Sequence, residues 1–80
     1  MKTTGYFDYK AALKRPEVKP EWIAETLANP VRRMVQSDGR IRFWRSIPEF
    51  GGRVLRVVTL ADGETVHNAF FDRSFREDER

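Results

Sequence analysis

Arginine is the residue of this sequence best suited to binding an anion, and it is concentrated in one stretch. From Val31 to Val57 the chain holds seven arginines, no lysine and two acidic residues. The planar guanidinium presents a fork of N–H donors that matches phosphate and carboxylate groups. This concentration predicts a polyanion-binding surface, although the whole chain carries a net charge of only +3. The seven are Arg32, Arg33, Arg40, Arg42, Arg45, Arg53 and Arg56.

Arg40, Arg42 and Trp44 alternate along one predicted strand, so they share one of its faces. An exposed indole beside guanidinium groups suits single-stranded RNA, because a base stacks on the ring while the phosphates meet the arginines. Arg53, on the next strand, joins this predicted RNA-binding set. The alternative is a solvated outer face, in which Trp44 is half buried beneath arginine side chains.

His67 is the only histidine, and its ordinary pKa makes it the obvious candidate for a general acid or base. On the predicted last strand it shares a face with Ala69, whereas Asn68 shares the other face with Val66. A single strand histidine is more often a structural hydrogen-bonding group than a catalyst, so both roles stay open.

Helical segments are predicted before residue 30. The segment 7–14 is either a short helix or an extended arm. The segment 20–28 is a clearer helix, because Pro20 suits the first turn and Asn29-Pro30 ends the pattern. An apolar stripe at helical spacing predicts that this helix packs on one face of a sheet; it consists of Trp22, Ile23, Thr26 and Leu27.

From Val31 onward the apolar pattern changes to a period of two, which predicts strands. Glycine-containing turns separate them, and Asp62-Gly63 is a typical hairpin signal. The third strand is apolar on both faces, so we expect it to be central. The predicted fold is therefore α+β, with one or two N-terminal helices on a four-stranded antiparallel β-meander. It forms one domain over 1–80, with 1–6 and 76–80 frayed; the strands cover 31–36, 40–47, 53–60 and 64–71.

Composition excludes several classes of site. The chain has no cysteine and one histidine, and its carboxylates lack the spacing of metal ligands, so we expect no metal and no cofactor. It has neither a secretory signal nor an apolar run of about 20 residues, which predicts a cytoplasmic protein without a membrane partner. We expect a monomer or a homodimer.

The order of a helix, an Asn-Pro pair and an arginine-rich β-meander resembles the RelE/BrnT-type toxin superfamily. The likeness is closest to an uncharacterised branch of small bacterial proteins and covers about residues 7–75. It is carried by Glu21-Trp22-Ile23, Ala28-Asn29-Pro30, the run from Asp38 to Trp44, Leu55-Arg56-Val57-Val58 and the run from Asp62 to Ala69.

The resemblance implies RNA as a partner, or an antitoxin-like or other protein. Characterised members are ribonucleases that cleave mRNA and are neutralised by an antitoxin. Carried over, the catalytic residues are His67, Arg56 and Arg73, with Arg42 also on the sheet. Two hypotheses follow. The first is a non-catalytic RNA- or protein-binding module with a toxin-like fold, and the second is a toxin-like mRNA endoribonuclease of a toxin–antitoxin pair.

Overall fold

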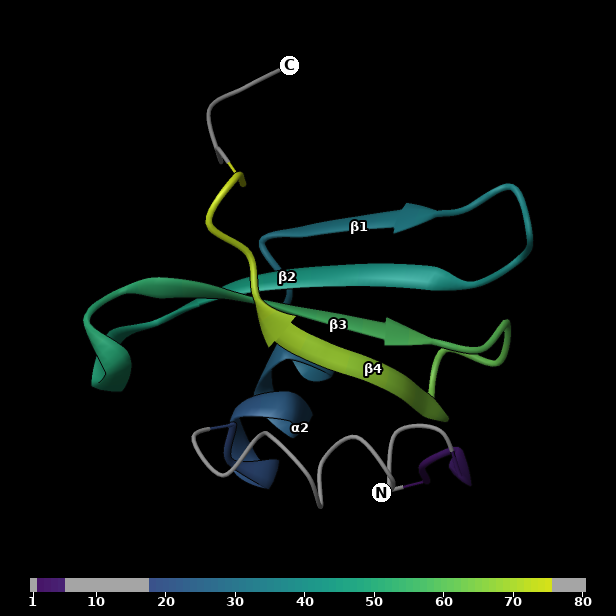
Figure 1. Cartoon of the computed structure of the whole chain (residues 1–80), viewed down its shortest axis with the longest axis horizontal. Helices are drawn as coiled ribbons and strands as arrows, with labels where there is room; N and C mark the ends of the chain where they lie inside the picture. Colours follow the sequence, from purple (N-terminus) through teal and green to yellow (C-terminus); the bar gives the residue numbers. More distant parts are fainter. Residues whose placement is uncertain (1, 6–17, 76–80) are drawn as a thin grey trace.

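The computed structural model of the chain describes residues 2–5 and 18–75. Its four strands form one antiparallel sheet in the order β1-β2-β3-β4 (Figure 1). This confirms the predicted α+β class and the four-stranded meander, with β3 paired on both sides. The predicted helix over 7–14 lies outside the described residues. The described elements are α2 (Pro20–Ala28), β1 (Arg32–Val35), β2 (Ile41–Ile47), the 3-10 turn η1 (Pro48–Phe50), β3 (Arg53–Thr59) and β4 (Val66–Phe71).

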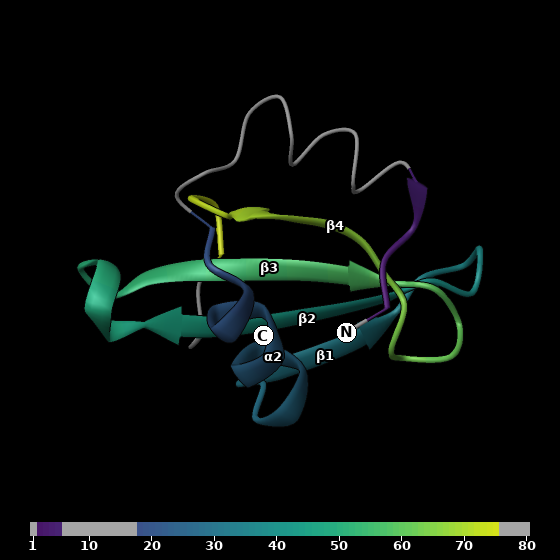
Figure 2. The same cartoon turned by 90° about the horizontal axis from the view of Figure 1, so that it is seen from below.

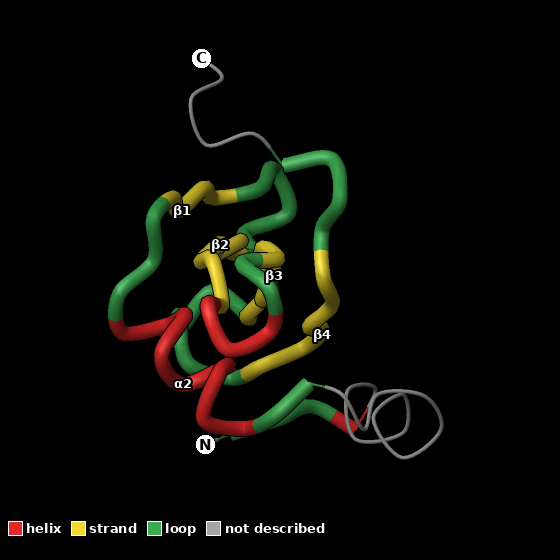
Figure 3. The backbone as a smooth tube through the Cα atoms, turned by 90° about the vertical axis from the view of Figure 1, so that its left-hand side faces the viewer, coloured by secondary structure: helices red, strands yellow, loops and turns green. Residues whose placement is uncertain are grey.

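Helix α2 begins and ends where the two prolines predict. Pro20 lies in the first turn, where its missing N–H leaves no hydrogen bond unmade. The N–H of Asn29 donates to the carbonyl of Glu25 at 2.8 Å, and Pro30 then cannot continue the helix. The helix covers one face of the sheet, and residues 72–75 lie on the other side (Figure 3).

The face of the sheet beneath α2, here called the helix face, carries the core. Charged side chains also lie on this face, among them Arg45, which alternates with the core residues of β2. Arg45 reaches the end of α2, where it donates to the carbonyl oxygen of Asn29 at 2.7 Å and pairs with Glu25 at 3.4 Å. A cation at this end complements the helix dipole. The buried cluster comprises Trp22, Ile23, Ile41, Phe43, Ile47, Leu55, Val57, Val66 and Ala69.

The N-terminal segment adds to the sheet beside the start of β4 (Figure 2). The N–H of Thr4 donates to the carbonyl of Val66 at 2.9 Å, and the N–H of Val66 donates to the carbonyl of Lys2 at 2.8 Å. Residues 2–4 therefore cover the edge of the sheet at this point. At the opposite edge, β1 is exposed along its whole length.

The predicted faces of β4 need one correction. Thr59 pairs with Val66 and Val58 pairs with Asn68, so His67 is the extra residue of a β-bulge. Val66 consequently turns into the core, whereas the strand pattern placed it with Asn68. The prediction that His67 shares the face of Ala69 is likewise wrong, because the bulge brings His67 to the side opposite α2.

Candidate functional site

The side of the sheet opposite α2, here called the open face, contains a polar hollow of about 280 Å³. Arginine side chains reach it from the β1–β2 hairpin and the two central strands, and His67 reaches it from the bulge of β4. The residues that line it include no carboxylate. The hollow is therefore suited to an anionic group. It is lined by Gln36, Arg40, Arg42, Arg56, Val58, His67, Asn68 and Phe70.

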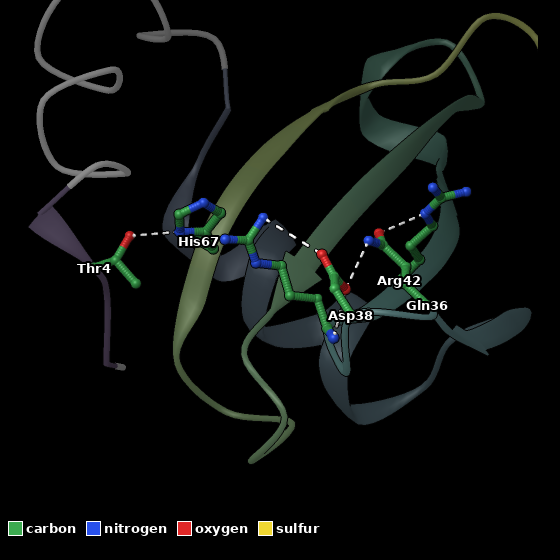
Figure 4. A network of polar contacts seen from close by, with 6 residues as sticks. Thr4, Gln36, Asp38, Arg42 and His67 are labelled. Carbon is green, nitrogen blue, oxygen red and sulfur yellow. Dashed lines mark hydrogen bonds and ion pairs between the residues drawn. The ribbon is translucent and has the colours of Figure 1, made fainter.

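Arg42 and Arg40 are fixed by a chain of polar contacts at the β1–β2 hairpin (Figure 4). Nε of Arg42 donates to Oε1 of Gln36 at 2.6 Å, and Nε2 of Gln36 donates to Oδ1 of Asp38 at 3.2 Å. The backbone N–H of Arg40 also donates to Oδ1 of Asp38 at 3.0 Å and, with the charge of Arg40, lowers the pKa of that carboxyl. Because Arg42 uses Nε for Gln36, its fork of terminal nitrogens is oriented without being consumed.

His67 lies in the hollow at the bulge of β4. Its Nδ1 is 3.1 Å from Oγ1 of Thr4, in the N-terminal segment that pairs with Val66. Burial lowers the pKa of His67 below 6.5, and the charge of Arg40 lowers it further against the opposing effect of Asp38. The imidazole is therefore neutral at pH 7, as a general base must be.

Arg56 lies between two aromatic rings on the open face. Its guanidinium carbon is 5.0 Å from the ring centroid of Phe70 and 5.9 Å from that of Trp44, both within cation–π range. Nη1 is 3.6 Å from Oδ2 of Asp72. Nε is buried and finds no hydrogen-bond acceptor within the described part of the chain. Arg56 is thus held by several contacts and has one buried donor that the described residues do not satisfy.

Trp44 shares the open face with Arg42 as predicted, but the exposed indole expected there is wrong, because only 5% of the residue is exposed. Phe75 stacks on it, with ring centroids 5.4 Å apart and an angle of 21°. Nε1 of Trp44 donates to Oδ2 of Asp72 at 3.1 Å. Burial raises the pKa of Asp72, but hydrogen bonds from Ser74 and Trp44 and the charge of Arg56 outweigh it, so the pKa lies below 3.8.

The structure brings together four of the residues singled out in the sequence, namely Arg40, Arg42, Arg56 and His67. Arg53 is on the helix face instead, with its guanidinium 4.9 Å from the ring centroid of Phe50. Arg73 lies in the turn after β4, is exposed and does not line the hollow. Trp44 does not line the hollow, but its ring contacts Arg56, which does.

The sequence reasoning missed Gln36 and Phe70 as members of this site. Gln36 flanks the β1–β2 turn and donates its N–H to the carbonyl of Arg40, so hairpin register places it beside the arginines. Phe70 is two positions after Asn68 and pairs with Arg56 across the sheet. Alternation along β4 is the signal for it, because it puts Phe70 on the same face as Asn68.

Other classes of site find no support in the described residues. Across residues 2–5 and 18–75, no group of three or more His, Asp or Glu side chains is placed to hold a metal ion. No helix in the same residues has the length and apolar character needed to cross a membrane. The chain matches no protein-family model, no curated protein and no solved structure.

Proposed function

We propose that this domain is a non-catalytic RNA-binding module with a RelE/BrnT-like fold, and that its open face holds the phosphate backbone of a single strand. The observation that carries the proposal is the convergence of Arg40, Arg42 and Arg56 with His67 on one polar hollow whose lining includes no carboxylate. Three guanidinium groups from two adjacent strands and a turn form a site for successive phosphates rather than for one small anion.

The rigidity of the site also supports RNA binding. Gln36 orients Arg42, and the rings of Trp44 and Phe70 hold Arg56, so little side-chain entropy is lost when a phosphate binds. Phe70 is half-buried beside these arginines and offers a base an apolar surface.

Fluorescence anisotropy with a labelled single-stranded RNA of about ten nucleotides tests the proposal. If the three arginines each contact a phosphate, log K should fall against log salt with a slope of about −2, since each contact to a single strand contributes about 0.7. Arg42→Ala should weaken binding and reduce this slope by about 0.7. The matched control is Arg53→Ala, which removes the same charge from the helix face.

Equal losses in Arg42→Ala and Arg53→Ala would show that only net charge matters, and would refute the proposed site. Absence of salt-dependent binding by the wild type would refute RNA binding altogether. The protein-binding version of the hypothesis, with an antitoxin-like or other partner, predicts that second outcome, so the titration separates the two versions.

The position of His67 favours a second candidate, a toxin-like mRNA endoribonuclease. A neutral imidazole in the hollow would accept the proton of a ribose 2′-hydroxyl, whose oxygen attacks the adjacent phosphorus; the 5′-oxygen is displaced and leaves as a hydroxyl with a proton from water. The arginines would stabilise the charge of the phosphorane. This candidate predicts RNA cleavage by the wild type that His67→Ala abolishes while binding is retained; intact RNA after prolonged incubation with the wild type contradicts it.

A further inference from the structure

The segment that follows β4 occupies part of the open face with groups that resemble a nucleotide. Residues 72–75 leave the end of β4 and pass Arg56 on β3 to reach Trp44 on β2 (Figure 1). The N–H of Asp72 donates to the carbonyl of Val54 at 2.8 Å, which anchors the start of the segment. The carboxylate at its start faces Arg56, which lines the hollow, and the ring at its far end contacts Trp44 beside it.

The ring of Phe75 lies where a base would stack. It is nearly parallel to the indole of Trp44, at 21° and a centroid distance of 5.4 Å, which is an offset-stacked arrangement. The guanidinium groups of Arg32 and Arg56 are each 5.9 Å from the ring centroid of Trp44. A base in this position would therefore have a cation from β1 and a cation from β3 close to its flanking phosphates.

The carboxylate of Asp72 lies where a phosphate would bind. Its Oδ2 accepts a hydrogen bond from Nε1 of Trp44 and is 3.6 Å from Nη1 of Arg56. The carboxylate leaves Nε of Arg56 without an acceptor among the residues that the structure describes. A phosphate has more acceptor oxygens than a carboxylate, and a guanidinium matches it through two parallel bonds.

We propose that residues 72–75 act as an internal nucleotide mimic, in which Phe75 stands in for a base and Asp72 for a phosphate. RNA that displaces the segment would stack one base on Trp44 and place a phosphate on Arg56. This inference rests on the proposed function and extends it, since it assigns a base-stacking subsite and a competitor for that subsite. The competitor keeps the affinity of the unmodified domain below what its open face allows.

Two labelled probes of equal length and charge separate the two halves of the mimic: a single-stranded RNA and the same phosphodiester chain without bases. In the full chain, Phe75→Ala should bind the RNA roughly two- to tenfold more tightly, the range given by one aromatic stacking contact. It should leave affinity for the abasic probe unchanged. Asp72→Asn keeps an acceptor for Trp44 and removes the charge facing Arg56, so it should tighten the binding of both probes.

Phe75→Ala that tightens neither probe, tightens both equally or weakens the RNA would overturn the base-mimic role. Asp72→Asn without effect on either probe would overturn the phosphate-mimic role, and far-UV circular dichroism of each variant reports whether it is folded. If the wild type binds both probes and the variants do not tighten binding, this inference fails while RNA binding stands. If no form of the chain binds either probe, the proposed function fails, and the inference fails with it.

Discussion

Asp72→Ala is the substitution expected to disturb the open face most. The side chain is 9% exposed and joins three elements. It accepts from Nε1 of Trp44 on β2, pairs with Arg56 on β3, and accepts from both the N–H and the hydroxyl of Ser74 through Oδ1. Alanine at this position removes all of these acceptors at once.

The magnitude follows from the groups left without partners. Trp44 is 5% exposed, so its Nε1–H would lose the acceptor that Asp72 provides, in a place with little access for water. An unsatisfied buried donor costs about 1–3 kcal/mol. Arg56 would also lose the carboxylate that faces it. We therefore expect Asp72→Ala to lower the free energy of unfolding by about 2–3 kcal/mol and Asp72→Asn by about 1 kcal/mol, because the amide oxygen still accepts from Trp44.

Urea denaturation at pH 7, followed by tryptophan emission and circular dichroism, measures these losses. The matched control is Asp38→Ala, because Asp38 also accepts backbone and side-chain hydrogen bonds and faces an arginine, but lies exposed on the β1–β2 turn. Asp38→Ala should lower the free energy of unfolding clearly less than Asp72→Ala does. Equal losses for Asp72→Ala and Asp38→Ala would contradict the importance assigned to burial.

The pH dependence gives a second test of the same contacts. The pKa of Asp72 is lower in the folded chain than its ordinary 3.8, so the contribution of its charge is fully present above 3.8 and is lost as the pH falls through the folded value. The stability gap between wild type and Asp72→Asn should therefore narrow as the pH is lowered below 3.8. A gap that stays constant down to the acid transition would show that the charge of Asp72 contributes nothing.

Three further predictions concern the bulge, the core and a turn. The ring protons of His67 should titrate with a midpoint below 6.5 in an NMR experiment, and a midpoint above 6.5 contradicts this. Because the folded chain disfavours the charged imidazole, the free energy of unfolding should decrease as the pH falls through that range. Leu55→Ala should lower the free energy of unfolding by about 2–5 kcal/mol, measured by thermal unfolding. Thr26 is equally buried, but Thr26→Val should change that free energy little, because the Thr26 hydroxyl only duplicates a helix hydrogen bond. Gly39→Ala should lower the free energy of unfolding by about 1–2 kcal/mol, because φ is +92° at this position. An unchanged free energy of unfolding would show that the turn relaxes.

The sequence predicts the elements well because their signals are local. Pro20 and Asn29-Pro30 give both ends of α2, and the change from helical spacing to a period of two marks the start of the sheet. The Asp62-Gly63 turn between β3 and β4 is also present, with Gly63 at a φ of +71°.

The parts of the site that the sequence does not predict depend on contacts between distant residues. The bulge that turns His67 to the open face arises where Val58 and Thr59 pair with β4. No residue type at this point of the sequence predicts a bulge. The cover over Trp44 comes from Phe75, which follows the last strand and carries no local signal of where it packs. Arg53 illustrates a third cause, since alternation within β3 separates it from Arg56, yet the register with β2 decides which of them meets Trp44.

A ¹H–¹⁵N NMR titration with a short single-stranded RNA tests the central claim most directly. The account predicts that the largest shifts, including those of the arginine Nε–H groups, occur at Arg42, Arg56 and His67 on the open face and diminish with added salt. Signals of α2 and of Arg53 should move little, because they belong to the helix face. Shifts that gather on α2, or a spectrum that does not change at excess RNA, would contradict the assignment of the open face as an RNA-binding surface.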